Sequence, residues 1–227
     1  MKRNKTVSPK AMRLERERKQ RRQTIVDMAR KFFIEHGYDG TMIEKIASEV
    51  GYTKVTIYNY FQSKDDLFVA VVADVYEKLY QIMDTHLKQE DVPFELRSMG
   101  DAYVIFFEKY PDDALLFESS RLSEVISNVR RKEEGGETLT ESELEFSSHL
   151  RVLEDLMTSV ITETMRNSGV QDKVDPFSVI MVLSTFAQAI RTLIARGMMS
   201  TTPETTTEEY LSVFFTIIDK GLRHYDD

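Results

Sequence analysis

The sequence contains no cysteine and no tryptophan, and it has only five prolines and nine glycines among 227 residues. The absence of cysteine excludes disulfides, thiolate zinc sites and cysteine nucleophiles. No apolar run reaches the roughly 18 residues that a membrane-spanning helix needs. The basic N-terminus lacks the apolar segment of a secretory signal. These absences favour a soluble protein of a reducing compartment, and we expect a cytoplasmic location.

Charge is distributed unevenly along the chain. The formal net charge is −8, but residues 1–64 hold 15 basic and 7 acidic residues and the remainder holds 15 and 31. This asymmetry favours a basic module for a polyanion, joined to an acidic body. The first 23 residues carry ten basic and two acidic residues. Three interpretations are open: the segment extends the first helix, its more proximal residues are disordered and reach the minor groove or backbone of a nucleic acid beside the main contact, or it is a tail that only raises non-specific affinity for a polyanion. The last interpretation is the most conservative.

Hydrophobic residues recur with helical spacing along the whole chain, and no strand pattern competes with them. The sequence therefore predicts an all-α fold. Three short helices are expected at the N-terminus, followed by a larger helical domain. The predicted boundaries are a basic arm at 1–20, a helix-turn-helix domain at 21–66 and a helical domain at 67–227.

Capping residues mark the ends of these helices. Gly37 is expected to end the first helix, and Thr41 with Glu44 forms a candidate capping box for the second. Thr53 is a good N-cap for the third helix, and Ser63 caps a fourth that runs to about residue 89.

The larger domain repeats these signals. Helices are expected at 99–110 and 112–126, followed by a charged loop at 130–138. Thr140 and Glu143 form a second capping box, for a helix that ends near Gly169. Asp175 precedes a proline at the start of a helix to about 196, which is apolar almost all round, and a last helix covers 208–225.

The stretch "GYTKVTIYNYFQSKDDLF", residues 51–68, is typical of a helix-turn-helix, because a glycine turn separates two short helices. The second helix begins at Lys54, and its outward positions suit DNA. Asn59 matches the adenine edge and Lys54 the guanine acceptors. The tyrosine hydroxyls suit phosphates. A plain packing module with half-buried tyrosines is the alternative. The candidate DNA-binding residues from this pattern are Thr53, Lys54, Val55, Thr56, Tyr58, Asn59, Tyr60 and Lys64.

At "TMIEKIASEVGYTKVTIYNYFQSKDDLF" the sequence strongly resembles the N-terminal domain of the tetracycline-repressor (TetR) family of transcription regulators, over about residues 21–68. The resemblance implies that residues 54–60 form the recognition helix and that Thr41 and Lys64 touch the DNA backbone. Val55 stands where the family frequently has glycine or another small residue. That difference bears on the operator sequence.

The resemblance also implies a homodimer that joins through its two last helices, 175–196 and 208–225, and reads a near-palindromic double-stranded operator. Burial of the helix at 175–196 within its own subunit is an alternative explanation of its apolar character. The family further implies that an unknown small-molecule effector binds the C-terminal domain. Apolar residues that could line its pocket, or could simply be core, are Tyr103, Phe106, Phe107, Tyr110, Phe117, Met157 and Phe186.

Catalysis is not expected, because the chain has no nucleophile elbow, no phosphate-binding glycine loop and no H-E-x-x-H run. The four histidines lie far apart, so neither a metal nor another cofactor is expected. The expected function is that of a dimeric transcriptional regulator, most simply a repressor that an effector releases. Two alternatives are a helix-turn-helix regulator controlled by a protein partner and an all-α enzyme or interaction protein that has lost DNA binding.

Overall fold

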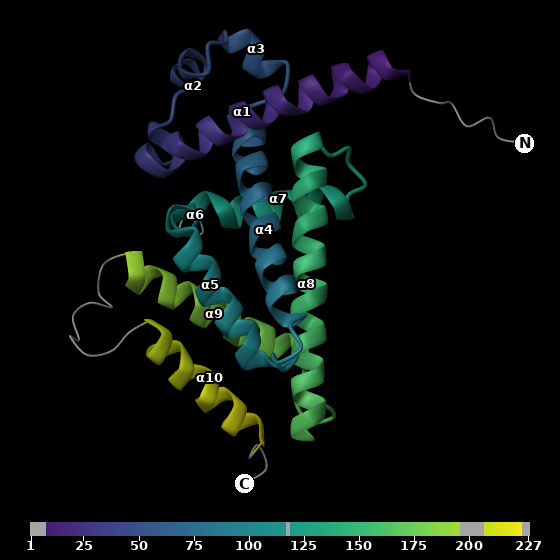
Figure 1. Cartoon of the computed structure of the whole chain (residues 1–227), viewed down its shortest axis with the longest axis vertical. Helices are drawn as coiled ribbons and strands as arrows, with labels where there is room; N and C mark the ends of the chain where they lie inside the picture. Colours follow the sequence, from purple (N-terminus) through teal and green to yellow (C-terminus); the bar gives the residue numbers. More distant parts are fainter. Residues whose placement is uncertain (1–7, 117–118, 196–206, 224–227) are drawn as a thin grey trace, which may run out of the picture. The chain divides into compact units, whose positions relative to one another are not determined.

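The computed structural model describes residues 8–116, 119–195 and 207–223, and all regular secondary structure in these ranges is helical (Figure 1). This confirms the all-α prediction. The helices are α1 (Pro9–Gly40), α2 (Ile43–Glu49), α3 (Lys54–Tyr58), α4 (Lys64–Leu87), α5 (Leu96–Lys109), α6 (Pro111–Leu116), α7 (Ser120–Glu134), α8 (Glu141–Ser168), α9 (Pro176–Ala195) and α10 (Thr207–Arg223). The chain divides into two compact units, Met1–Val71 and Val72–Asp227, and α4 begins in the first and ends in the second.

The first unit is built on α1, which is much longer than a domain of this size needs. Its N-cap Ser8 accepts a hydrogen bond from the Ala11 amide, and a proline follows at the first helical position. Residues 9–20 of the expected arm are therefore helical. Gly37, at φ 68° and ψ 176°, interrupts the helical backbone near the C-terminal end, as the sequence predicted.

The buried face of α1 meets α2, α3 and the first turns of α4 in one core. Its largest fully buried side chains include Ile25, Ile46, Ile57, Phe61 and Phe68. Ring contacts extend this core, because Phe33 meets Phe68 edge-on with the ring centroids 5.0 Å apart. The three-helix unit thus holds its short helices by packing, since helices of five and seven residues are not stable alone.

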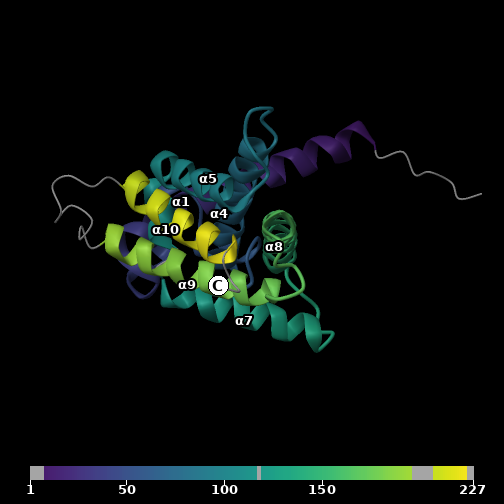
Figure 2. The ribbon, with the colours of Figure 1, turned by 90° about the horizontal axis from the view of Figure 1, so that it is seen from below.

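In the second unit, α5 contacts α8 and α10, and α8 contacts α9 (Figure 2). A buried hydrogen bond joins α5 to α8: the Leu96 amide donates to the Thr164 hydroxyl at 2.9 Å. Gly100 lets α10 approach α5, because a Cβ at that position would overlap the Phe215 ring. The α8 side chain His149 donates from Nδ1 to the Ala73 carbonyl of α4 at 2.9 Å.

Most of the expected caps are present. Thr140 and Glu143 make both bonds of a capping box, and Gly169 ends α8 in the left-handed conformation at φ 73°. Asp175 accepts from the Ser178 amide at the start of α9. These predictions are confirmed. The sequence could indicate them because a capping side chain and the amide that it accepts from are only about three positions apart.

Two boundaries differ from expectation. The predicted helix at 112–126 is two helices, α6 and α7, and α7 continues to Glu134 through most of the charged segment predicted to be a loop. Arginine, lysine and glutamate are good helix formers, so the helix ends only at Gly135. Among the described residues, no helix combines the length and apolar character needed to cross a membrane.

Candidate nucleic-acid interface

The turn between α2 and α3 has the geometry that a helix-turn-helix requires. Gly51 adopts φ 71°, a region that a side chain disfavours, and the Tyr52 amide donates to the Ala47 carbonyl at 2.8 Å. The hydroxyl of Thr53 then accepts from the Thr56 amide at 3.1 Å and caps α3. The turn therefore fixes where α3 begins relative to α2.

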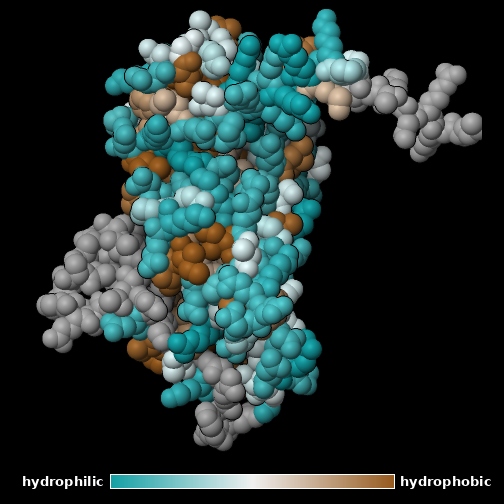
Figure 3. Space-filling model, viewed as in Figure 1, coloured by the Kyte–Doolittle hydropathy of each residue, from teal (hydrophilic) through white to brown (hydrophobic). Residues whose placement is uncertain are grey.

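One face of α3 is buried and the other is exposed. Ile57 is fully buried, whereas Val55 is 70% and Tyr58 is 42% exposed. Lys54 and Asn59 are also exposed, and hydrophobic side chains are visible over this part of the molecule in Figure 3. An exposed valine and tyrosine beside polar groups form a surface that can contact base edges and methyl groups.

The flanking residues belong to the same surface. Thr53 is exposed, Thr56 and Tyr60 are half-buried, and the hydroxyls of Thr53 and Thr56 lie 2.9 Å apart in a hydrogen bond. The guanidinium of Arg18 lies 5.9 Å from the centre of the Tyr60 ring. The structure thus brings the α3 candidates together and adds a cation from α1 that the sequence analysis did not single out.

Lys54 has a partner in the protein. Its Nζ lies 2.5 Å from Oε1 of Glu44 on α2. This hydrogen bond lowers the pKa of Glu44 below its usual value and raises the pKa of Lys54. Both groups are therefore charged at neutral pH, and a phosphate or a base edge would compete with the carboxylate for the ammonium.

Lys64, at the start of α4, is held by aromatic and backbone contacts. Its Nζ lies 4.4 Å from the centre of the Tyr38 ring and 3.4 Å from the Asp39 carbonyl oxygen. The Tyr38 hydroxyl donates to Asp65 of the same first turn. Tyr38 was not among the predicted site residues, although it lies within residues 21–68, over which the resemblance extends. These contacts hold half-buried Lys64 at the start of α4, whose first turn also carries Asp65 and Asp66.

Thr41 does not lie on this surface. It is 2% exposed, and its hydroxyl donates to the carbonyls of Phe32 at 3.0 Å and Gly37 at 2.7 Å. The N-cap of α2 is Met42, without a side-chain hydrogen bond. The predicted capping box is therefore wrong, and the Thr41 hydroxyl is not available to a phosphate in this structure.

Of the seven candidate pocket residues, four lie together on α5 or at its C-terminal end, and the others lie elsewhere. Tyr103, Phe107 and Tyr110 are half-buried along α5 around the fully buried Phe106, and a hydrophobic patch lies over α5 in Figure 3. Ring centroids in this series are 4.6 to 5.7 Å apart. Half-buried Phe186 on α9 packs on Val104 of α5 and stacks on the Phe214 ring of α10. Half-buried Met157 lies on α8, and Phe117 lies outside the described residues.

A charged cluster borders the aromatic series. The ammonium of Lys78 on α4 lies 3.0 Å from Oδ2 of Asp113 and 3.3 Å from Oδ2 of Asp74, and 5.0 Å from the centre of the Tyr110 ring. Asp113 is 4% exposed. No periodicity indicated this cluster, because Lys78 and Asp113 are 35 positions apart. Among the described residues, no group of three or more acidic or histidine side chains is placed to hold a metal ion.

Helices α9 and α10 keep apolar side chains exposed. The exposed fractions are 65% for Phe177 and 53% for Val182 on α9, and 59% for Val213 and 62% for Ile217 on α10. These helices cover the described parts of the two segments expected to form the dimer. Burial within the same subunit therefore does not account for the whole apolar pattern.

Comparison with known proteins agrees with this geometry. Residues 25–71 match the family described as bacterial regulatory proteins, tetR family. The chain is similar to the HTH-type transcriptional repressor AcnR of Corynebacterium diphtheriae, with 32% identity over 63 residues, 28% of this chain and 33% of that protein. It is also similar to the HTH-type transcriptional regulator AcrR of Shigella flexneri, with 24% identity over 98 residues, 43% of this chain and 42% of that protein. The chain thus spans about a third to two fifths of these curated relatives, which are named as regulators of transcription.

Solved structures extend the similarity of fold to nearly the whole chain. The fatty acid degradation regulator FadR from Bacillus halodurans has a TM-score of 0.60 at 16% identity and covers 96% of both chains. AibR, solved with isovaleryl coenzyme A and operator DNA, has a TM-score of 0.56 at 15% identity, covering 87% of this chain and 97% of its own. At these identities the likeness shows the fold alone.

Residues 43–58 have the geometry of a helix-turn-helix, and a separate helical unit follows them along the chain. Residues 25–71 carry the domain described as bacterial regulatory proteins, tetR family.

Proposed function

We propose that the protein is a cytoplasmic, dimeric, sequence-specific DNA-binding regulator of transcription, and that it acts as a repressor which a small molecule releases. The observation that carries the proposal is the outward face of α3. An exposed Val55 and Tyr58, with Lys54 and Asn59, surround the buried Ile57 that anchors the helix. The exposed Val55 methyls and the Tyr58 hydroxyl are groups that can contact a thymine methyl and a phosphate oxygen.

Each side chain of this face has a distinct role in the proposed complex. The Asn59 amide pairs with an adenine edge, and the Val55 methyls contact a thymine methyl. Lys54 leaves Glu44 to reach guanine acceptors or a phosphate. Tyr58, Tyr60 and Lys64 bind phosphate oxygens and set the register without reading sequence. Thr53 and Thr56 hold the start of α3 and add hydroxyl donors at the same edge.

The dimer is proposed to form through α9 and α10, whose exposed apolar side chains need a partner surface. A two-fold interface places the same face of each subunit against the other, so four helices form the contact. Two recognition helices would then enter successive major grooves, with half-sites about one helical turn apart. This geometry predicts a near-palindromic operator.

An effector is proposed to bind the second unit beside the aromatic series on α5. FadR from Bacillus subtilis, with a TM-score of 0.60 at 15% identity, was solved with stearoyl-CoA, and AibR with isovaleryl coenzyme A. Acyl thioesters are therefore the first probes. Because α4 runs from Lys64 past Lys78, a ligand that favours one position of α4 would change DNA affinity. A hundredfold release requires about 2.7 kcal/mol of coupling.

The proposal is tested by selecting bound duplexes from a random pool with the full-length protein at moderate salt. Enrichment of a palindrome with half-sites about one turn apart is the expected result. Recovery of DNA without a common sequence would reject sequence-specific reading. The selected operator is then titrated with acyl-CoAs of short and long chain, with free coenzyme A as the control. Failure of every small molecule, with operator binding intact, would favour control by a protein partner.

A further inference from the structure

The N-terminal segment of α1, residues 9–23, is a capped helix with an unusual concentration of cations. It contains seven basic and two acidic residues, and Lys10, Arg13, Arg16, Lys19 and Arg21 are exposed. Ser8 closes the first turn, and Arg13 pairs with Glu17 at 2.8 Å within the helix. The segment is therefore a rod with cations at fixed spacing.

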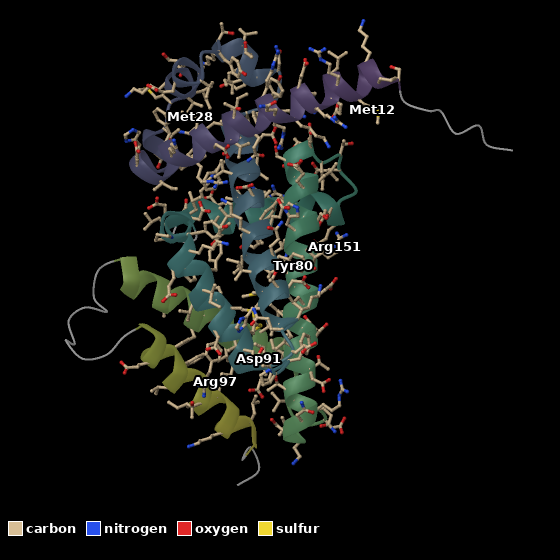
Figure 4. All side chains as sticks on the ribbon, viewed as in Figure 1. Met12, Met28, Tyr80, Asp91, Arg97 and Arg151 are labelled. Atoms are coloured by element: carbon tan, nitrogen blue, oxygen red, sulfur yellow. The ribbon has the colours of Figure 1, made fainter. Side chains whose placement is uncertain are left out.

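This rod is fixed relative to the recognition helix. The guanidinium of Arg22, only 7% exposed, lies 5.1 Å from the centre of the Phe61 ring, and Arg18 lies over Tyr60 one turn earlier. Both aromatic rings belong to the segment that directly follows α3. The cations of residues 10–21 thus extend from the domain beside the end of α3, and Figure 4 marks this extension at Met12.

The composition of the rod indicates the kind of partner. Met12 and Leu14 are 49% and 56% exposed. At about 100° per residue, two positions turn the helix by about 200°, so the two side chains point to nearly opposite sides. They form no apolar stripe for a partner helix or a membrane surface. Cations occur all round, which suits a polyanion reached by its charges alone.

We infer that this extension of α1 binds the phosphates of duplex DNA just outside each half-site, and the inference rests on the proposed DNA-binding function. From Arg22 to Arg13 the helix advances nine residues, about 14 Å at 1.5 Å per residue. That length corresponds to about four base pairs at 3.4 Å each. The operator recognised by the protein is thus longer than the bases that α3 reads.

The test measures the affinity of the full-length protein for its selected operator in duplexes with zero to eight flanking base pairs on each side. Wild-type affinity should rise about tenfold or more and level off near five base pairs. A variant with Arg13, Arg16 and Lys19 replaced by glutamine should lose this gain while keeping its base preference. Its absolute salt slope should fall by up to about five for a dimer.

Two controls distinguish the effect of the α1 extension on affinity from the effect of the protein's total charge. Replacing exposed Lys88, Arg131 and Arg166 of the second unit by glutamine removes the same charge and should leave the gain intact. Gln20→Pro keeps every cation but breaks the helix between the cations of residues 10–19 and the Arg22 contact, so it should lose the gain that Gln20→Ala retains. Circular dichroism would show that the remaining helices are intact.

The possible outcomes are distinct. A wild-type affinity independent of flank length, or a Gln20→Pro variant equal to Gln20→Ala, would overturn the inference while leaving the proposed function in place. An equal gain from single-stranded overhangs would replace duplex recognition by a general polyanion site. Absence of any selected sequence would instead reject the proposed function itself.

Discussion

The ammonium of Lys54, in the first turn of α3, lies 2.5 Å from the carboxylate of Glu44 on α2. The pair joins the two helices of the motif across their exposed side. Its hydrogen bond lowers the pKa of Glu44, so the contact is complete above the ordinary carboxyl pKa and is lost as the pH falls through the lowered value. At neutral pH the recognition helix therefore presents a cation that is partly neutralised by its neighbour.

Replacing Glu44 by glutamine should tighten DNA binding, because it removes a negative charge beside the phosphates and releases Lys54. The absolute salt slope should rise by about one for each subunit. Fluorescence anisotropy over a salt series measures both quantities. Glu49→Gln removes the same charge from an exposed position of the same helix and should have the smaller effect. Equal effects of the two substitutions would show that general charge, and not release of Lys54, is responsible.

Asn59→Ala should relax discrimination at one base of each half-site, at a cost of roughly 1–3 kcal/mol for the preferred base. The reason is that the amide carries both a donor and an acceptor for one base edge. Repeating the duplex selection with the variant identifies the position. Lys64→Ala should instead weaken binding to all sequences similarly and lower the absolute salt slope by about one for each subunit. An unchanged base preference in Asn59→Ala would remove that residue from the reading surface.

The helix ends that the sequence predicted correctly depend on short-range chemistry. Thr53, Gly169 and the pair Thr140–Glu143 cap helices through bonds to groups at most four positions away. Such bonds can be predicted from the sequence because the two bonded residues are always separated by the same small number of positions. The order of the helices and the turn at Gly51 followed from the same signals.

What the sequence could not indicate depends on partners far along the chain. Thr41 has the residue pattern of a capping box, but its buried hydroxyl is shared between the carbonyls of Gly37, four positions earlier, and Phe32, nine positions earlier. Tyr38 reaches Asp65 across 27 positions, and Lys78 reaches Asp113 across 35. These contacts appear only once α1, α4 and α6 are packed, so no local pattern predicts them.

Lys78→Met should destabilise the protein by roughly 1.5–3 kcal/mol, the usual worth of hydrogen bonds to charged groups. The substitution removes the ammonium that lies 3.0 Å from Asp113, whose side chain is 5% exposed. Urea unfolding monitored by circular dichroism measures the change. Lys88→Met is the control, because Lys88 pairs with Asp84 on the surface with a side chain that is 71% exposed. A similar loss in both variants would mean that the Lys78 cluster carries no special stabilisation.

Thr164→Val should cost about 1–3 kcal/mol, because it removes the acceptor of the Leu96 amide at the buried start of α5. Valine has nearly the same shape as threonine, so the change reports the unpaired amide and not a cavity. Thr162→Val, at an exposed position of the same helix, should change stability by less than about 0.5 kcal/mol. Denaturation midpoints of the two variants give the comparison, and hydrogen exchange of the Leu96 amide should accelerate only in Thr164→Val.

Ile217→Glu should convert the proposed dimer into a monomer. Ile217 is 62% exposed on α10, and a carboxylate there would be desolvated at the proposed interface. Sedimentation velocity at micromolar protein should show the mass of one chain for the variant and of two for the wild type. Leu144→Glu introduces the same charge at an apolar position of α8 that is 58% exposed, and it should remain dimeric. The monomer should also lose most of its operator affinity, since each half-site is then bound alone. A wild-type protein that sediments as one chain would exclude the dimer outright, and a dimeric Ile217→Glu would move the interface away from this face of α10.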